Sequence, residues 1–236
     1  MKIRIVLGCL IVFIATAVTA RSQQVVYVCP EGTYETSFFG YRECKSLTDE
    51  PSRPANQKSQ ALTAAETTLG LAMIGSKTLD NAARVLKDPR NKNYENGQWL
   101  FDEPKTGEFC SASFLRRDVG VMVLGPGGGI PGAFLIFFGP QVPKSKEIAK
   151  IKVTLTQTGG DPPQTVQALN FTHPTMQDYG TIVFAVPSFE AALAGTEDVH
   201  KFGVSVQGKS VIDVEWNGGF AARDKLKQCA AQRAKK

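Results

Sequence analysis

The feature that most constrains this chain is a succession of short β-prone segments from residue 98 onward. Runs rich in Val, Ile, Phe and Thr alternate with Gly- and Pro-containing stretches at 125–132, 159–163 and 207–209. This spacing predicts an antiparallel sheet with short connections. The predicted strands are Trp99–Phe101, Cys110–Arg116, Val119–Leu124, Ala133–Phe138, Lys150–Gln157, Thr165–Leu169, Thr181–Val186, Gly203–Val206 and Ser210–Trp216.

Helical periodicity occurs on both sides of these strands. Apolar residues recur at helical spacing over 61–87, where Thr63 and Glu66 form a capping-box pattern and Gly75-Ser76 marks a point where the helix can break. One or two helical turns are expected at 188–194, and a final helix at Ala221–Lys235. The spacing of Ala222, Leu226 and Cys229 places them on one face of that helix as a small apolar stripe, with Phe220 just ahead of it. The fold class is therefore α+β: a mostly antiparallel sheet with one apolar face, partly covered by the C-terminal helix.

The N-terminus predicts export. Lys2 and Arg4 precede an uncharged apolar run over residues 5–18, and the small-residue pattern ending at Ala20 suits cleavage by signal peptidase. A membrane anchor needs about 20 apolar residues, more than this run contains. A lipoprotein signal at Cys9 is the other alternative, although most of the apolar run follows that cysteine. We expect residues 1–20 to be a signal peptide and the remainder to be periplasmic or secreted.

Four of the five cysteines remain after such cleavage: Cys29, Cys44, Cys110 and Cys229. An even number in an exported chain predicts two disulfides. Of the three possible connectivities we favour Cys29–Cys44, which would staple a short hairpin, and Cys110–Cys229, which would anchor the last helix. A four-cysteine zinc site is disfavoured because no C-x-x-C pair is present.

The mature chain divides into two regions. Residues 21–97 hold the stapled hairpin at about 25–45, a Pro-containing linker and the first helix; residues 98–236 form the β-rich domain. A net charge of +5 over 236 residues does not indicate nucleic-acid binding. With two histidines in the chain, we expect no metal site and no cofactor.

Two motif matches are better explained as coincidences. Residues 203–210 fit the P-loop pattern G-x-x-x-x-G-K-S, but a P-loop must open a helix. Here alternating β-prone residues lie on both sides, so the Gly208-Lys209 pair predicts a hairpin turn and no ATP binding. Lys105-Thr106-Gly107 copies one β-lactamase box without its S-x-x-K partner.

The remaining candidates are isolated polar groups. His173 precedes Asp178, and His200 follows Glu197 and Asp198, so either histidine is a candidate for proton transfer, although surface placement is the simpler interpretation. Asn170-Phe171-Thr172 has the form of an N-glycosylation acceptor. The Gly-rich 125–132 segment is a candidate binding loop, with a plain strand connection as the alternative.

The C-terminal helix is basic. It carries Asp224 as its single acidic residue against six basic ones, namely Arg223, Lys225, Lys227, Arg233, Lys235 and Lys236. Such a helix suits anionic lipid, a glycan or an envelope protein as partner, and a solvated helix face is the alternative.

The second half of the chain resembles a loose group of small exported bacterial proteins of uncharacterised function. The shared features are Trp99, the strand opening Cys110-Ser111-Ala112-Ser113, and a closing helix with Gly219-Phe220-Ala221-Ala222 before Leu226-Lys227-Gln228-Cys229. The resemblance covers about residues 98–230. It implies the architecture and the long disulfide, and it implies no catalytic residues.

Two functions are consistent with these observations. The first is a non-enzymatic exported protein that binds an unidentified partner, which the export signal and disulfides favour. The alternative is a hydrolase acting on cell-envelope polymers through carboxylates such as Asp161 or Asp178.

Overall fold

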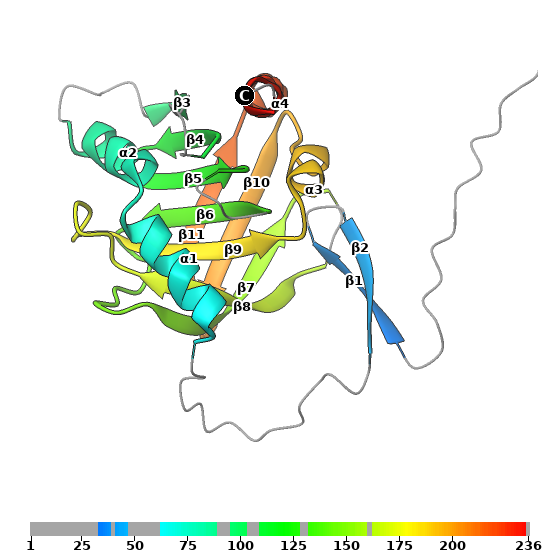
Figure 1. The fold of residues 1–236 in the computed structure, drawn as a ribbon. Helices are drawn as coiled ribbons and strands as arrows, with labels where there is room; N and C mark the ends of the chain where they lie inside the picture. The colour runs from blue at the N-terminus through cyan, green and yellow to red at the C-terminus, as the bar shows by residue number, and fades with distance from the viewer. Residues whose placement is uncertain are drawn as a thin grey trace, which may run out of the picture.

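The fold is described from a computed structural model, which covers residues 33–38, 41–46, 62–88, 95–102, 109–127, 132–159 and 162–234. Its main part is one nine-stranded sheet in the order β11-β10-β7-β8-β9-β6-β5-β4-β3, with every neighbouring pair antiparallel (Figure 1). The strands are β3 (Gln98–Asp102), β4 (Ser111–Arg116), β5 (Val119–Leu124), β6 (Ala133–Gly139), β7 (Ala149–Gln157), β8 (Gln164–Phe171), β9 (Gly180–Val186), β10 (His200–Val206) and β11 (Lys209–Trp216).

The predicted strands are all present, and their bounds agree within three residues. The strand order is not sequential, however. Strands β3 to β6 form one meander, and β9 then pairs with β6, while β7 pairs with both β8 and β10. The sheet thus consists of two meanders, β3 to β6 and β7 to β9, joined along β6 and β9, and of the β10–β11 hairpin, which pairs with β7.

The prediction of a single apolar face was wrong for the middle of the sheet. Alternate residues of β6 point into two separate cores: Leu135 and Phe137 into one, Ile136 and Phe138 into the other. All seven residues of β6 are buried. Continuous apolar runs of this kind are needed where helices cover both faces of a sheet. The expected alternation is found in the edge strand β11, where buried and exposed residues alternate over Ile212–Trp216.

Two helices cover one face of the sheet. Helix α1 (Ala64–Ile74) starts with the predicted capping box, in which Thr63 and Glu66 exchange hydrogen bonds. It ends at Gly75, and α2 (Lys77–Lys87) begins two residues later, so the break at Gly75-Ser76 is confirmed. Their buried side chains, including Met73 and Leu79, join the core that contains Phe138.

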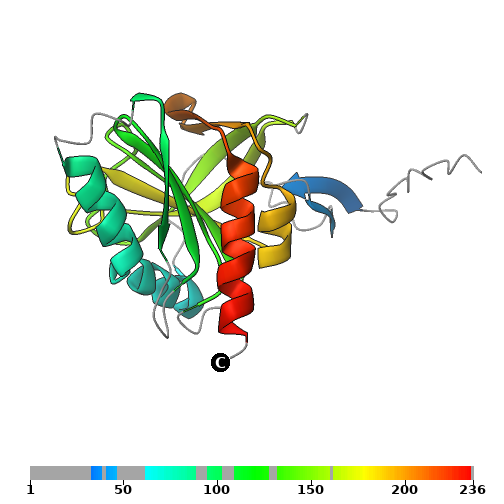
Figure 2. The same ribbon diagram turned by 90° about the horizontal axis from the view of Figure 1, so that it is seen from above.

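The other face is covered by α3 (Phe189–Ala194) and α4 (Gly219–Arg233), and Figure 2 shows the two helix pairs on different sides of the strands. Ala222 and Leu226 are buried in the core on this face, and Cys229 packs against its edge. This is the predicted apolar stripe of α4. Phe220 does not belong to it, because its ring is 47% exposed.

Near the N-terminus, β1 (Thr33–Phe38) pairs antiparallel with β2 (Tyr41–Ser46). A hairpin was predicted here, but from an earlier segment: the β-prone residues 25–28 lie outside the described residues, and the 34–41 stretch pairs with the one that follows it. Cys29 also lies outside them, so the Cys29–Cys44 bridge and the 1–20 signal peptide remain predictions. Within the described residues, no helix is both long and apolar enough to cross a membrane.

Candidate functional site

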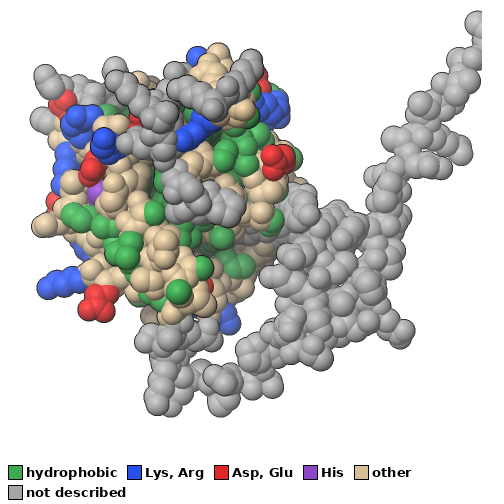
Figure 3. Space-filling view, in the orientation of Figure 1, with side chains coloured by type: hydrophobic (Ala, Val, Ile, Leu, Met, Phe, Trp, Pro, Cys, Tyr) green, Lys and Arg blue, Asp and Glu red, His purple; other side chains and the backbone are tan. Residues whose placement is uncertain are grey.

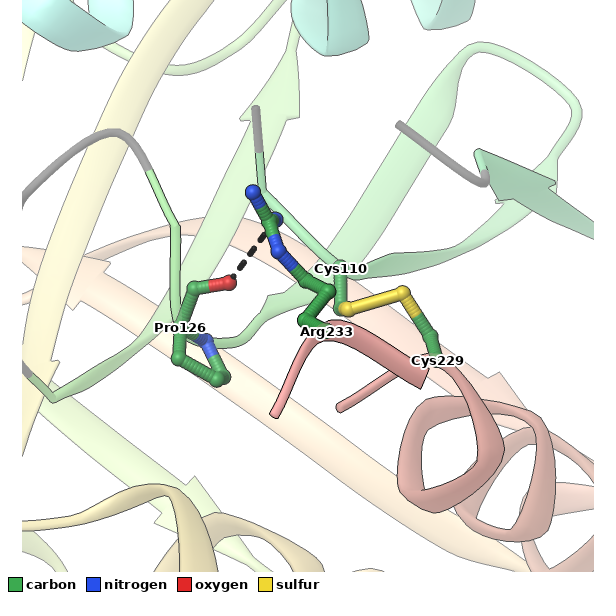
Figure 4. The surroundings of a disulfide bond; sticks show 4 residues. All are labelled: Cys110, Pro126, Cys229 and Arg233. Atoms are coloured by element: carbon green, nitrogen blue, oxygen red, sulfur yellow. Dashed lines mark hydrogen bonds between the residues drawn. A yellow bond between two sulfur atoms is a disulfide. The ribbon is translucent and has the colours of Figure 1, made fainter. Parts of the chain in front are cut away.

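The disulfide between Cys110 and Cys229 is present and closes a separation of 119 residues. The sulfur bridge joins α4 to the residue that precedes β4, and Cys110 is fully buried. Arg233, one turn after Cys229, donates from Nη1 to the carbonyl of Pro126 at 3.2 Å (Figure 4). The same carbonyl accepts from the Cys110 N–H at 3.4 Å. The end of α4 is therefore fixed to the sheet by both a covalent and a polar link.

The P-loop match forms a hairpin. Strands β10 and β11 pair on either side of it, with Val206 opposite Lys209. The two turn residues, Gln207 and Gly208, both have positive φ angles, of 53° and 77°. That is the signature of a type I′ turn. Lys209 opens strand β11 and not a helix, so this segment does not form the cradle of N–H groups that binds phosphate.

The basic residues of α4 do not share one face. Arg233 is engaged with Pro126, and the Arg223 guanidinium lies over the Phe220 ring at 4.5 Å. Lys225 and Lys227 are exposed, but with a 3.6-residue period they lie about 160° apart around the helix, with Asp224 near the middle of the exposed arc. A continuous cationic stripe would favour binding to an anionic surface. The described part of α4 has no such stripe.

The structure places the other candidates as follows. Asn170 is buried, and its amide donates to the carbonyls of Pro143 and Thr181, so the glycosylation pattern is inaccessible. Asp161 lies outside the described residues. Asp178 is exposed in the loop before β9. In the Gly-rich segment, residues 128–131 likewise fall outside the described ranges.

Both histidines are buried, against the expectation of surface placement. His200 stacks on Phe202 with ring centroids 4.3 Å apart and also contacts the Trp216 ring. Its Nδ1 is 3.6 Å from a carboxylate oxygen of Glu197. His200 and Glu197 are therefore close in the structure as well as in the sequence. The His200 ring, however, packs in a cluster with Phe202 and Trp216.

His173 lies in a polar chain that the sequence does not reveal. Its Nδ1 is 2.8 Å from the Thr175 hydroxyl, which donates to Oδ1 of Asp80 at 2.9 Å. Asp80 is on α2, and Thr175 is in the loop between β8 and β9, 95 residues further along the chain. Asp80, and not the predicted Asp178, is therefore the carboxylate beside His173.

The direction of these hydrogen bonds follows from the donors available. A hydroxyl has one proton, and a carboxylate oxygen can only accept, so the Thr175 proton is directed at Asp80. His173 Nδ1 contacts the oxygen of the same hydroxyl at 2.8 Å, and the Thr175 N–H points at Nδ1 from 3.4 Å. The hydroxyl proton is therefore engaged by Asp80, and the imidazole lies against the hydroxyl oxygen.

Burial lowers the pKa of His173 below its usual value of 6.5. Two weaker influences act in the opposite direction. The Asp80 carboxylate, 3.8 Å from Nδ1, and a hydrogen bond to the Ile74 carbonyl both favour the charged imidazole. Because burial dominates, the neutral form is favoured in the folded protein.

A second polar chain runs along the same helix. Asp102, on β3, accepts through Oδ2 from the Thr78 hydroxyl and from the Asn81 amide, each at 3.1 Å. Asn81 in turn accepts from the Arg84 guanidinium at 2.5 Å. Each of these groups is thereby held in one orientation by its neighbour.

The two chains meet at a surface depression of about 260 Å³, lined by Asp80, Asn81, Ala83, Arg84, Lys87 and Thr175. We call it the α2 depression. Lys87 closes one side by donating to the backbone carbonyl of Thr175. Figure 3 shows Lys and Arg side chains gathered over α2, with acidic side chains and a histidine beside them. Sequence reasoning missed this site because its lining comes from two segments far apart in the chain, α2 and the loop that holds Thr175.

Within the described residues there is no group of three or more His, Cys, Asp or Glu side chains arranged to hold a metal ion. The α2 depression presents charged and hydrogen-bonding side chains, which suit polar recognition. Comparison of the chain with known proteins finds no matching family model, no similar curated protein and no similar solved structure.

Proposed function

We propose that this chain is an exported, disulfide-stabilised protein that binds a partner molecule at the α2 depression. Export is supported by the N-terminal sequence, and the Cys110–Cys229 bridge is consistent with an oxidising compartment. Binding, in preference to catalysis, is supported by the roles of the polar groups: His173 and Asp80 both serve to fix the Thr175 hydroxyl.

The observation that carries the proposal is the immobilisation of polar side chains around one depression. Long charged side chains on a helix surface usually lose rotamer freedom when a partner binds, which weakens binding. Here Arg84 is held by Asn81, and Lys87 by the Thr175 carbonyl, before any partner arrives. Such a preorganised surface binds at lower entropic cost than a freely moving one.

The test has two stages. Mature protein is used to capture partners from an envelope extract, and captured proteins are identified by mass spectrometry. The complex is then treated with a lysine-acetylating reagent and compared with the free protein. Lys87 borders the α2 depression, whereas Lys209 and Lys225 are exposed elsewhere.

We expect the partner to protect Lys87 and to leave Lys209 and Lys225 as reactive as in the free protein. Protection of Lys225 with Lys87 unchanged would place binding on α4 and reject the α2 depression. The hydrolase alternative is judged separately, by whether mature protein releases soluble fragments from isolated envelope polymers.

A further inference from the structure

The two cations of the α2 depression have only neutral hydrogen-bond partners. Arg84 donates to the amide oxygen of Asn81, and Lys87 donates to a backbone carbonyl. Within the described residues, neither side chain lies within 4.0 Å of a carboxylate. Lys201 and Lys150, by contrast, each pair with an acidic residue. The positive charges of Arg84 and Lys87 are hydrogen-bonded to neutral groups and are not paired with a carboxylate of the described residues.

These cations are three residues apart on α2, so they lie on the same face of the helix, beside the depression they both line. An anionic group placed between them would gain two charge-assisted hydrogen bonds. From this arrangement we infer that the α2 depression binds a carboxylate side chain on an acidic segment of a protein partner. The inference rests on the proposed function and names the chemistry of the partner.

Asp80 restricts which anion fits. Its carboxylate lines the same depression and is held there by the Thr175 hydroxyl. A negative charge close to Asp80 is repelled, so a compact dianion such as phosphate is less favourable than a single carboxylate that reaches only Arg84 and Lys87. Spaced carboxylates on a peptide satisfy this condition, because each one occupies the depression singly.

The experiment uses the mature protein and a synthetic decapeptide of alternating Glu and Ser, with the matching Gln–Ser peptide as the neutral control. Binding is followed by NMR as shifts of backbone amides. We expect saturable shifts at residues 80–88 and 173–176 with the Glu–Ser peptide. Binding of the Gln–Ser peptide, and of inorganic phosphate at equal concentration, should be at least tenfold weaker.

Two variants with the same change in net charge separate a site from general attraction. Arg84→Gln/Lys87→Gln should weaken binding of the Glu–Ser peptide at least tenfold. Lys225→Gln/Lys227→Gln, on α4, should change it less than twofold. All four replaced side chains are exposed, so both variants should retain the melting temperature of the parent protein.

Equal loss in the two variants, equal binding of the two peptides, or no saturable shift at α2 would each overturn the inference. Such a result would leave the proposed function standing if a captured partner still protected Lys87 from acetylation. Conversely, peptide binding at α2 combined with protection only of Lys225 would reject the proposed function while the carboxylate site remained.

Discussion

Trp99 and Trp216 lie with their ring centroids 5.3 Å apart, although they come from the two opposite edge strands of the sheet, β3 and β11. The Trp99 Nε1–H also donates to the carbonyl of Asn217, directly after β11, at 2.6 Å. The sheet is therefore curled until its first and last strands meet through side chains. Both rings join the core that α3 and α4 cover.

Replacing Trp99 with alanine should loosen this contact between the sheet edges. Full burial of a Trp is worth about 3 to 5 kcal/mol against alanine, and Trp99 is partly exposed, so we expect a loss on the order of 2 kcal/mol in the free energy of unfolding. Urea denaturation measures it. Trp99→Phe keeps an aromatic ring but removes the hydrogen bond to Asn217, and should cost about 1 kcal/mol. Equal stability of Trp99→Ala and the parent would show that the edges are held together elsewhere.

The Cys110–Cys229 bridge should stabilise the protein mainly by fixing α4. In the Cys110→Ser/Cys229→Ser variant we expect a loss of about 2 to 5 kcal/mol, and the C-terminal segment should be the first released by protease. Thermal melting and limited proteolysis are the measurements. Arg233→Gln is the matched control, because it removes the link to Pro126 and keeps the bridge. If protease cleaved Arg233→Gln earlier than the double serine variant, the hydrogen bond to Pro126 would hold α4 more firmly than the disulfide, which would contradict this prediction.

Two glycines at helix ends should respond differently to alanine. A Cβ at Gly219, the first residue of α4, would lie 2.0 Å from the backbone carbonyl oxygen of Glu197, which is closer than any real contact. Gly219→Ala should therefore cost about 1 to 3 kcal/mol or more, since backbone must move. At Gly75 the nearest atom is 3.5 Å away and φ is −83°, so Gly75→Ala should be neutral or stabilise by up to about 1 kcal/mol. Chemical denaturation of both variants decides this.

The lowered pKa of His173 makes stability depend on pH. The unfolded chain takes up a proton near pH 6.5, but the folded protein resists protonation until lower pH. The stabilisation is therefore fully present above about pH 6.5 and is lost as the pH falls through the folded-state pKa. Unfolding free energies measured from pH 8 to pH 4 should fall over this window, and His173→Asn should reduce the fall.

Asp80→Asn tests the assigned causes of the lowered pKa of His173. The Asp80 carboxylate opposes the effect of burial, so its removal should lower the pKa of His173 further and move the window to more acidic pH. NMR titration of the two histidines follows this directly. A rise in the pKa of His173 in this variant would reject the assigned electrostatics.

Elements defined by local pattern were predicted well. The turn at Gly208 and the break at Gly75 depend on residues adjacent in sequence, and both are where they were expected. The pairing of Cys110 with Cys229 was favoured because it would anchor the last helix, and the structure confirms it. The stripe of Ala222, Leu226 and Cys229 follows from helical periodicity alone.

Features that depend on distant contacts were not predicted. Burial of both sheet faces requires that α1 and α2 pack on the side opposite α4, and no local pattern encodes that choice. The α2 depression combines Asp80 with Thr175, and β3 contributes Asp102, which orients Asn81. His173 was expected at the surface because no nucleophile or ligand set lies near it in sequence, whereas the fold buries it against α2, where Asp80 lies 3.8 Å from its Nδ1.

The long span of the Cys110–Cys229 bridge sets an order of events during biosynthesis. Cys110 leaves the ribosome 119 residues before Cys229, which at 5 to 20 residues per second is roughly 6 to 24 s. If the chain enters an oxidising compartment while it is being made, the Cys110 thiol lacks its native partner during that interval and earlier cysteines compete for it. Correct oxidation would then depend on late reshuffling or on early burial of Cys110 in the first meander. An isomerase-deficient host should accumulate mispaired forms that retain Cys229 as a free thiol.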